Sequence, residues 1–179
     1  PASPRFRTSY GRKILKVKSM IIHYTPKLSE QIRNFFEAEK LPQELLNKLN
    51  HLRKTCTYRP EMEFYEVDDH RIRGGLLIST VPFIGENALI PCMKIHLLYV
   101  GEAYRKQRIG TELLSLGERA IQNTDTKALF TIRNTFYLKR GYQTLDNFPI
   151  QSLDGIPENQ ILIKTLTENL PPGKIAVSG

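Results

Sequence analysis

The sequence predicts a single α/β domain built on a mixed β-sheet, and three observations lead to that prediction. Short, β-branched apolar runs alternate with amphipathic segments of helical period. Two of the runs are joined by a turn, as in a hairpin, and two others by a helix, as in a parallel crossover. The chain has 179 residues, enough for one domain with a sizeable core. We expect about six to seven strands and about four flanking helices within residues 20–169.

The first half of this domain is expected to contain a strand, two helices and a hairpin. The apolar spacing predicts, in order, a strand at 20–25, helices at 26–38 and 42–53, and hairpin strands at 62–67 and 72–81. Pro42 followed by Gln43 and Glu44 is typical of a helix start. Gly74 and Gly75 lie within the second hairpin strand, which indicates a bulge or the close approach of another group.

The second half is expected to contain a strand–helix–strand unit followed by two short strands. The pattern predicts a loop at 83–91, then a strand at 93–100, a helix at 109–122 and a strand at 127–132. After these it predicts a short helix at 134–140, a strand starting at 143–146, a polar loop at 147–159 and a last strand at 160–166. From Leu170 onward two prolines and a glycine predict a tail, 170–179, without regular structure.

The basic charge of the chain is concentrated at its N-terminus. The net charge is +8, and six of these charges come from basic residues within 1–19, a segment without any acid. Residues 20–179 therefore carry +2, an ordinary value for a soluble domain, which argues against nucleic acid as a partner of the domain itself. We interpret 1–19 as a leader or extension outside the fold. The alternative is a basic arm for RNA, acidic lipid or organelle targeting.

Composition argues against several classes of protein. No apolar run approaches the ~20 residues that span a bilayer, and no secretory signal pattern follows the early charges. Cys56 and Cys92 lie far apart without a CxxC motif, and the four histidines are scattered. The sequence thus predicts no metal site and no disulfide framework, which favours a cytoplasmic location.

Two segments carry the chemistry. In the first, an apolar strand ending at Val100 runs into the basic turn 105–108, and a helix with Gly110 in its first turn follows. Backbone N–H groups at a helix start, flanked by Arg and Lys, favour binding of a phosphate or pyrophosphate. The second segment, 136–142, is an aromatic helical turn closed by Gly141. Together and at this spacing, the two segments resemble the coenzyme A site of the GNAT N-acetyltransferase superfamily.

This resemblance implies an acetyl-CoA site in which a splayed pair of parallel strands holds the pantetheine arm. The family's phosphate-binding pattern matches Arg105 and Gly110, whereas Arg108 stands where the first glycine is expected. We expect Arg108 to take right-handed helical geometry and to offer its guanidinium to phosphate. Backbone contacts are expected from 98–100 on one strand and 132–133 on the other. The implied cofactor-binding residues are Leu98, Tyr99, Val100, Arg105, Lys106, Gln107, Arg108, Ile109, Gly110, Thr111 and Asn134.

The resemblance also implies a mechanism. Tyr137 matches the family tyrosine that protonates the departing thiolate, and a backbone N–H near a strand bulge at Leu98–Val100 is expected to polarise the thioester. The amine attacks directly, because neither cysteine has a base beside it in sequence. The general base is not assigned. Lys94 stands where the histone-modifying branch has a glutamate, and His96, Glu63 and Glu66 are candidates.

The acceptor is predicted only as an amine, either a small molecule or a protein amine. Six acids could draw a cationic acceptor: Glu61, Glu63, Glu66, Asp146, Asp154 and Glu158. Two other functions stay open at this point, a non-catalytic acyl-CoA-binding module and a nucleic-acid- or ribosome-associated protein acting through the basic arm. The strand 161–166 could be an edge that pairs across a homodimer.

Overall fold

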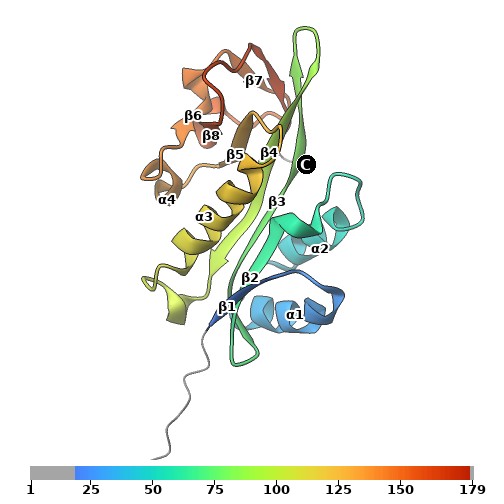
Figure 1. Cartoon of the computed structure of the whole chain (residues 1–179), viewed down its shortest axis with the longest axis vertical. Coiled ribbons are helices and arrows are strands. Elements are labelled where there is room, and N and C mark those ends of the chain that lie inside the picture. The colour runs from blue at the N-terminus through green and yellow to red at the C-terminus, as the bar shows by residue number, and fades with distance from the viewer. Residues whose placement is uncertain (1–18, 178–179) are drawn as a thin grey trace, which may run out of the picture.

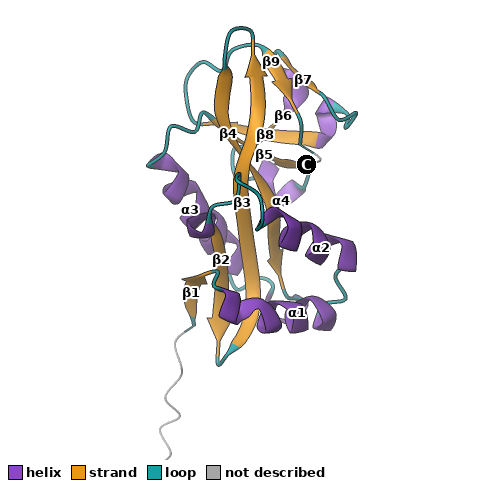
Figure 2. Cartoon of the chain, turned by 90° about the vertical axis from the view of Figure 1, so that its right-hand side faces the viewer, coloured by secondary structure: helices purple, strands orange, loops and turns teal. Residues whose placement is uncertain are grey.

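One long, twisted mixed sheet runs the length of the molecule, with helices on both of its faces (Figures 1 and 2). The computed structural model describes residues 19–177. The strand order is β1-β2-β3-β4-β5-β8-β6, and β9 pairs with β3 and with β7. The strands are β1 (Met20–His23), β2 (Glu63–Asp68), β3 (Arg71–Gly85), β4 (Leu89–Val100), β5 (Ala128–Ile132), β6 (Gln143–Thr144), β7 (Ile150–Ser152), β8 (Ile161–Thr165) and β9 (Gly173–Ile175).

Helix α3 (Ile109–Gln122) covers one face, and α1 (Ser29–Ala38) and α2 (Gln43–Leu52) cover part of the other (Figure 2). The short helix α4 (Thr135–Leu138) follows β5. The apolar side of α3 packs on Leu76, Ile78, Met93 and Ile95, and that of α1 and α2 packs on Tyr65, Leu77 and Leu97. The predicted α/β class, the mixed sheet and the four helices are confirmed within the described residues.

The long β3–β4 hairpin differs from the expected loop at 83–91. Pairing continues from Gly74↔Val100 out to Ile84↔Leu89, so the connection shrinks to residues 86–88. The pairing is antiparallel and includes Pro82 opposite Pro91. Because proline cannot donate a hydrogen bond to a strand ladder, a local pattern that contains Pro82 and Pro91 does not indicate the extension.

The expected tail at 170–179 and the expected polar loop at 147–159 each contain a strand. Strand β9 pairs with β3 at Phe83–Gly85 and with β7 at 150–152. Ile175 and Val177 are completely buried against Phe83, Cys92 and Phe130. Up to Val177 the C-terminal segment is therefore part of the core. The basic segment 1–18 lies outside the described residues.

The glycine pair of β3 has both consequences expected of it. The β2–β3 register shifts between Glu66 and Val67, opposite this part of β3. A Cβ at Gly75 would come within 2.6 Å of Tyr65 Cε1, so only a glycine accommodates that ring. The β2–β3 turn is formed by Asp69 and His70, both left-handed with φ of 46° and 63°, as in a type I′ hairpin turn.

Strand β8 is not the expected edge. Its Ile161–Thr165 residues pair with β5, and Leu162 and Ile163 pair with β6 on the other side. Because both sides of β8 are hydrogen-bonded within the chain, this strand does not offer a surface for pairing across a homodimer.

Candidate functional site

The two central strands β4 and β5 separate part-way along their length. They pair in parallel over only three positions, ending at Lys94↔Phe130. Beyond Lys94, β4 continues to Val100, whereas β5 turns toward α4 and stays paired with β8. The β4 edge from Ile95 to Val100 consequently has no neighbouring strand on the β5 side within the described residues. This confirms the splayed parallel pair and leaves backbone amides free to bind an extended ligand.

A β-bulge interrupts β4 beside this open edge. Leu77 pairs with Leu97 and the next residue, Ile78, pairs with Ile95, so His96 has no partner in the register. The expected bulge thus lies at His96 rather than at Leu98–Val100. An unpaired residue redirects its backbone groups away from the ladder, which places a candidate N–H donor next to the point where β4 and β5 part.

The basic turn after β4 has an unusual backbone conformation. Lys106 and Arg108 are left-handed, with φ of 65° and 68°. The expectation of right-handed geometry for Arg108 was wrong, and Arg108 is the N-cap of α3. Left-handed residues separated by one position turn successive N–H groups toward a common centre, which favours anion binding. The left-handed geometry also explains why a glycine suits this position.

Replacing Arg108 by glycine separates strain from ligand binding. We expect Arg108→Gly to raise the free energy of unfolding by about 0.5–1 kcal/mol. Left-handed geometry costs a residue with a side chain about 1–2 kcal/mol, and glycine avoids this cost. Part of the gain is offset because glycine loses more conformational entropy on folding. Urea unfolding measures this. Arg108→Ala is the matched control, since it removes the guanidinium but keeps the strain. A glycine variant less stable than the alanine variant would contradict the assignment.

Two cavities that share lining residues lie between the two segments identified from the sequence, the basic turn before α3 and the aromatic turn 136–142. The first, of about 370 Å³, lies along the open edge, and the second, of about 400 Å³, lies over the start of α3. Both are lined by Val100, Arg105, Gly110 and Phe136. The first adds Leu98, Tyr99, Asn134 and Tyr137, and the second adds Tyr104, Lys106, Arg108, Ile109, Thr111 and Arg140. Of the residues expected to bind cofactor, Gln107 alone lines neither cavity.

Arg140 is a basic residue that sequence reasoning did not assign to the site. One of its terminal nitrogens donates to Thr111 Oγ1 and the other to Phe136 O, each at 2.7 Å. The guanidinium carbon lies 3.6 Å from the centre of the Phe136 ring. These contacts hold Arg140 at the wall of the second cavity together with Arg105, Lys106 and Arg108. Its place directly before Gly141, the closing glycine of the aromatic turn, is the sequence signal that could have identified it.

Several expected contacts take a different form. Asn134 caps α4, its Oδ1 accepting from Phe136 N at 2.9 Å. Arg133 N and Nη1 donate to Gln160 O and Asn159 O, so this residue is tied to the β8 side. Arg105 folds back to donate to Tyr99 Oη at 3.2 Å and to Val100 O at 3.4 Å. A phosphate in the second cavity would compete for the same guanidinium.

Tyr137 lines the first cavity and is 7% exposed. Burial raises the pKa of its phenol to about 12, and a hydrogen bond with Thr131 offsets part of that rise. Its ring packs against Phe136 and Tyr142. The phenol therefore keeps its proton at neutral pH while one side of it faces the cavity.

The candidate bases on β2 are both held in buried ion pairs. Glu63 is fully buried and accepts from Arg53 at 2.5 and 3.1 Å and from the hydroxyls of Tyr58 and Tyr65. Glu66 accepts from Arg73 at 2.5 Å on the α3 side of the sheet. Neither carboxylate lines the two cavities at the open edge, and both accept from arginines, so neither is assigned as the base. The third candidate, His96, faces the side opposite α3 and contacts Ser79.

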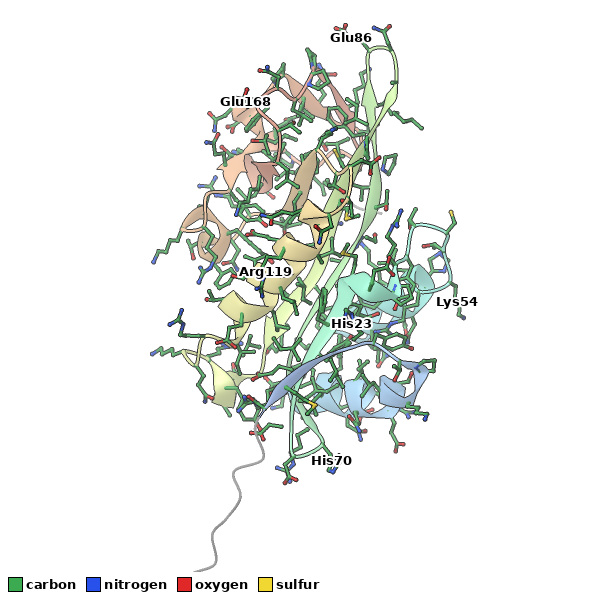
Figure 3. The ribbon with its side chains drawn as sticks, in the orientation of Figure 1. His23, Lys54, His70, Glu86, Arg119 and Glu168 are labelled. Atoms are coloured by element: carbon green, nitrogen blue, oxygen red, sulfur yellow. The ribbon has the colours of Figure 1, made fainter. Side chains whose placement is uncertain are left out.

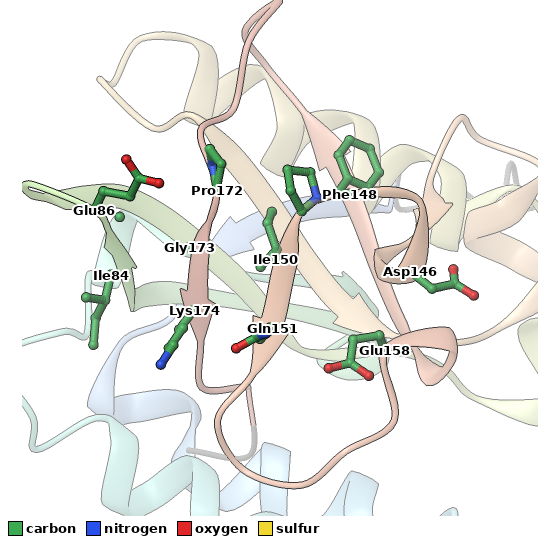
Figure 4. A pocket seen from close by; sticks show the side chains of 12 residues that line it. Ile84, Glu86, Asp146, Phe148, Ile150, Gln151, Glu158, Pro172, Gly173 and Lys174 are labelled. Carbon is green, nitrogen blue, oxygen red and sulfur yellow. The ribbon is translucent and has the colours of Figure 1, made fainter.

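The acidic residues do not gather into one acceptor surface. Asp146 and Glu158 line a separate cavity, of about 760 Å³, beside β3, β7 and β9 (Figure 4). This cavity shares no lining residue with the two cavities at the open edge. Asp154 accepts from Val177 N and Ser152 Oγ, and Glu61 forms an exposed pair with Arg59. The expected attraction of a cationic acceptor by these acids is not supported.

Comparisons with known proteins agree with this geometry. No helix in the described part of the chain is long and apolar enough to cross a membrane. The chain resembles a GNAT family N-acetyltransferase, YhbS, from Escherichia coli, solved in complex with CoA, with 15% identity and a TM-score of 0.76 over 89% of each chain. It also resembles a GNAT family acetyltransferase from Brucella melitensis, solved in complex with acetyl-CoA, with 14% identity and a TM-score of 0.64 over 90% of this chain and 96% of that chain.

A third structure shares the fold, and a family model covers most of the domain. An acetyltransferase of the GNAT family from Staphylococcus aureus Mu50 has 14% identity and a TM-score of 0.59 over 84% of this chain and all of that one. No curated protein sequence matches. The model of the acetyltransferase (GNAT) family matches residues 28–142, more than half of the chain and both motifs of the site. This chain therefore belongs to the GNAT acetyltransferase family.

Proposed function

We propose that this protein transfers an acetyl group from acetyl-CoA to an amine by direct attack. The observation that carries the proposal is the continuity of three features: the open β4 edge, the cavity along it, and the second cavity ringed by basic residues at the start of α3. An extended arm with amide groups and a terminal pyrophosphate fits this combination. Acetyl-CoA supplies an acetyl group activated as a thioester.

The residues of the second cavity are suited to hold phosphate. Arg105, Lys106, Arg108 and Arg140 provide four cationic side chains around a space of about 400 Å³. The first N–H groups of α3 have no partner within the helix and add the positive end of its dipole. The backbone of 98–100 would bind the amide groups of the arm, as an added strand binds a sheet edge.

The first cavity provides two groups for the chemistry. The unpaired backbone at the His96 bulge would polarise the thioester carbonyl. Tyr137 would donate its phenolic proton to the sulfur as the thiolate leaves. No acyl-enzyme is required, because Cys92 is buried on the other side of β4 from α3, among the C-terminal residues, and Cys56 is exposed after α2. Two free thiols agree with a reducing cytoplasm, which we propose as the location.

Calorimetric titration with acetyl-CoA and with coenzyme A tests this proposal. Arg105→Ala should weaken binding about tenfold or more, because one charge-assisted contact is lost. Gly110→Trp should abolish binding, since a Cβ at Gly110 already lies 3.4 Å from Val100 Cγ2 and 3.6 Å from the Phe136 ring, and the indole would fill the cavity.

The matched control is Arg119→Ala, which removes an exposed arginine from the same helix away from its start (Figure 3). This variant should bind both ligands as the wild type does. Absence of binding by the wild type at millimolar ligand would contradict the proposed cofactor site.

A further inference from the structure

The face of the sheet opposite α3 is covered in two parts. Helices α1 and α2 cover one part, over Tyr65 and Leu97. Apolar side chains of Leu145, Ile150, Ile175 and Val177 cover the other, over Phe83 and Phe130. Figure 2 shows the two covers at different heights of the sheet. Phe130, which ends the pairing with Lys94, lies under one cover, and Leu97 lies under the other, so the two covers meet at the β4–β5 separation. An acceptor approaching from this side would reach the separation at that junction.

Three polar residues lie at this junction and belong to neither apolar cluster. Ser79 and Lys94 are cross-strand partners on β3 and β4. Met93 and Ile95 pack under α3, so Lys94 between them faces the opposite side. The His96 ring joins this group, because its Nε2 lies 2.8 Å from Ser79 Oγ. Lys94 is also the last residue of β4 that pairs with β5.

Lys94 is a buried amine. It is 5% exposed, and its Nζ donates a hydrogen bond to Val177 O. Burial and the nearby charge of Lys48 on α2 lower its pKa to about 8, and Asp154 acts in the opposite direction. At neutral pH most of the Lys94 side chains are thus charged, and an anion beside it would be favourable.

His96 remains neutral beside this lysine. Burial, Lys94 and Lys48 lower its pKa to about 3. Its Nδ1 is buried without a hydrogen-bond partner in the described part of the molecule. A buried polar atom in this condition costs free energy unless a ligand group satisfies it. The polar group formed by Ser79, Lys94 and His96 therefore contains a nitrogen, His96 Nδ1, that can still accept or donate a hydrogen bond.

We infer that the acceptor is an amine that carries a carboxylate close to its amino group, as an α-amino acid does. Lys94 binds the carboxylate, and His96 Nδ1 forms a hydrogen bond with a polar group of the acceptor. This inference rests on the proposed acetyl transfer and names the acceptor class for it. The opposite class, polyamines and aminoglycosides, would bring an ammonium group toward Lys94. Of the six acids considered, Glu63, Glu66 and Asp154 are engaged with Arg53, Arg73 and the Val177 backbone, respectively. The other three lie elsewhere: Glu61 pairs with Arg59, and Asp146 and Glu158 line a separate cavity.

The test compares L-amino acids with their carboxamides and with the amines left by decarboxylation, for example phenylalanine, phenylalaninamide and phenethylamine. With acetyl-CoA as donor, at least one amino acid should have kcat/KM about tenfold or more above both analogues, since a charge-assisted hydrogen bond is gained. Binding of the N-acetylated products to the free enzyme gives a second readout that needs no turnover. The N-acetyl amino acid should bind more tightly than its amide.

Lys94→Met should remove this preference in both readouts, and Lys94→Arg should retain part of it. Lys54→Gln is the control, because Lys54 is an exposed lysine just after α2 (Figure 3). The wild-type comparisons need no variant, so they decide the matter even if Lys94→Met does not fold. Equal use of acid and amide, a preference for amines without carboxylate, or acetylation of no amino acid would each overturn the inference.

Failure of the proposed function is distinguishable from failure of this inference. Acetyl-CoA binding by the same preparation is measured first. If that binding is absent, the proposed acetyl transfer is contradicted. If it is present and the acceptor comparison fails, the carboxylate site alone is wrong.

Discussion

Tyr137→Phe should lower kcat by about 10²- to 10⁴-fold, the range typical of losing a general acid. The variant removes only the hydroxyl, so the ring contacts with Phe136 and Tyr142 remain. Stability and acetyl-CoA affinity should change little. Thiol release from acetyl-CoA, followed with the best amine from a screen, measures kcat, and calorimetry measures binding.

Tyr142→Phe is the matched control for this variant. Tyr142 is equally buried, but its hydroxyl donates to Glu118 Oε1 of α3 at 3.0 Å and it does not line the cavity. Its loss should leave kcat within a few-fold of the wild type. Because the pKa of Tyr137 is raised to about 12, the phenol stays protonated through pH 10, and any fall in kcat below that pH has another cause. An unchanged kcat in Tyr137→Phe would contradict the role of Tyr137 as general acid. Binding of acetyl-CoA by the wild type without thiol release to any amine would instead favour a non-catalytic acyl-CoA-binding module.

Arg53→Met should lower the free energy of unfolding by about 3–5 kcal/mol, as expected when one partner of a buried ion pair is removed. Glu63 is fully buried, and the arginine side chain is 8% exposed at the end of α2. Without the guanidinium, the carboxylate keeps only the hydroxyls of Tyr58 and Tyr65. Urea unfolding with a two-state fit measures the change.

Two comparisons support this second prediction. Arg59→Met breaks an exposed pair with Glu61 at 3.9 Å and should cost less than about 1 kcal/mol. Arg53→Met combined with Glu63→Gln should be more stable than Arg53→Met alone, because the unpaired charge is gone. If Arg53→Met and Arg59→Met lose similar stability, the buried cluster does not hold α2 to the sheet as described.

The strand–turn–helix unit and the aromatic turn were predictable because their signals are local. The helix at Ile109–Gln122 has the predicted bounds, since its apolar spacing and its glycine-containing first turn lie within one short segment. The parallel pairing of β4 with β5 follows from the helix between them. The conformation of Arg108 was not predictable, because left-handed geometry in a residue other than glycine depends on how the strand and helix are joined.

The role of each charged residue was decided only by tertiary structure. The sequence offered Glu63 and Glu66 as candidate bases on a strand with aromatic residues. In the structure each carboxylate pairs with an arginine from another element: Glu63 with Arg53 after α2, and Glu66 with Arg73 on β3. Lys94 was identified only by its position in the strand, and its burial depends on Val177, 83 residues further along the chain.

By itself, the sequence determined the order of the main elements, the basic turn before α3 and the aromatic turn that contains Tyr137, since these depend on periodicity and on residue types a few positions apart. The tertiary structure alone decided the place of β7 and β9, the bulge at His96, and which polar groups are paired or left free at the β4–β5 separation. These features depend on contacts between distant segments, and the free energy of such contacts is set by burial and pairing that no local pattern records.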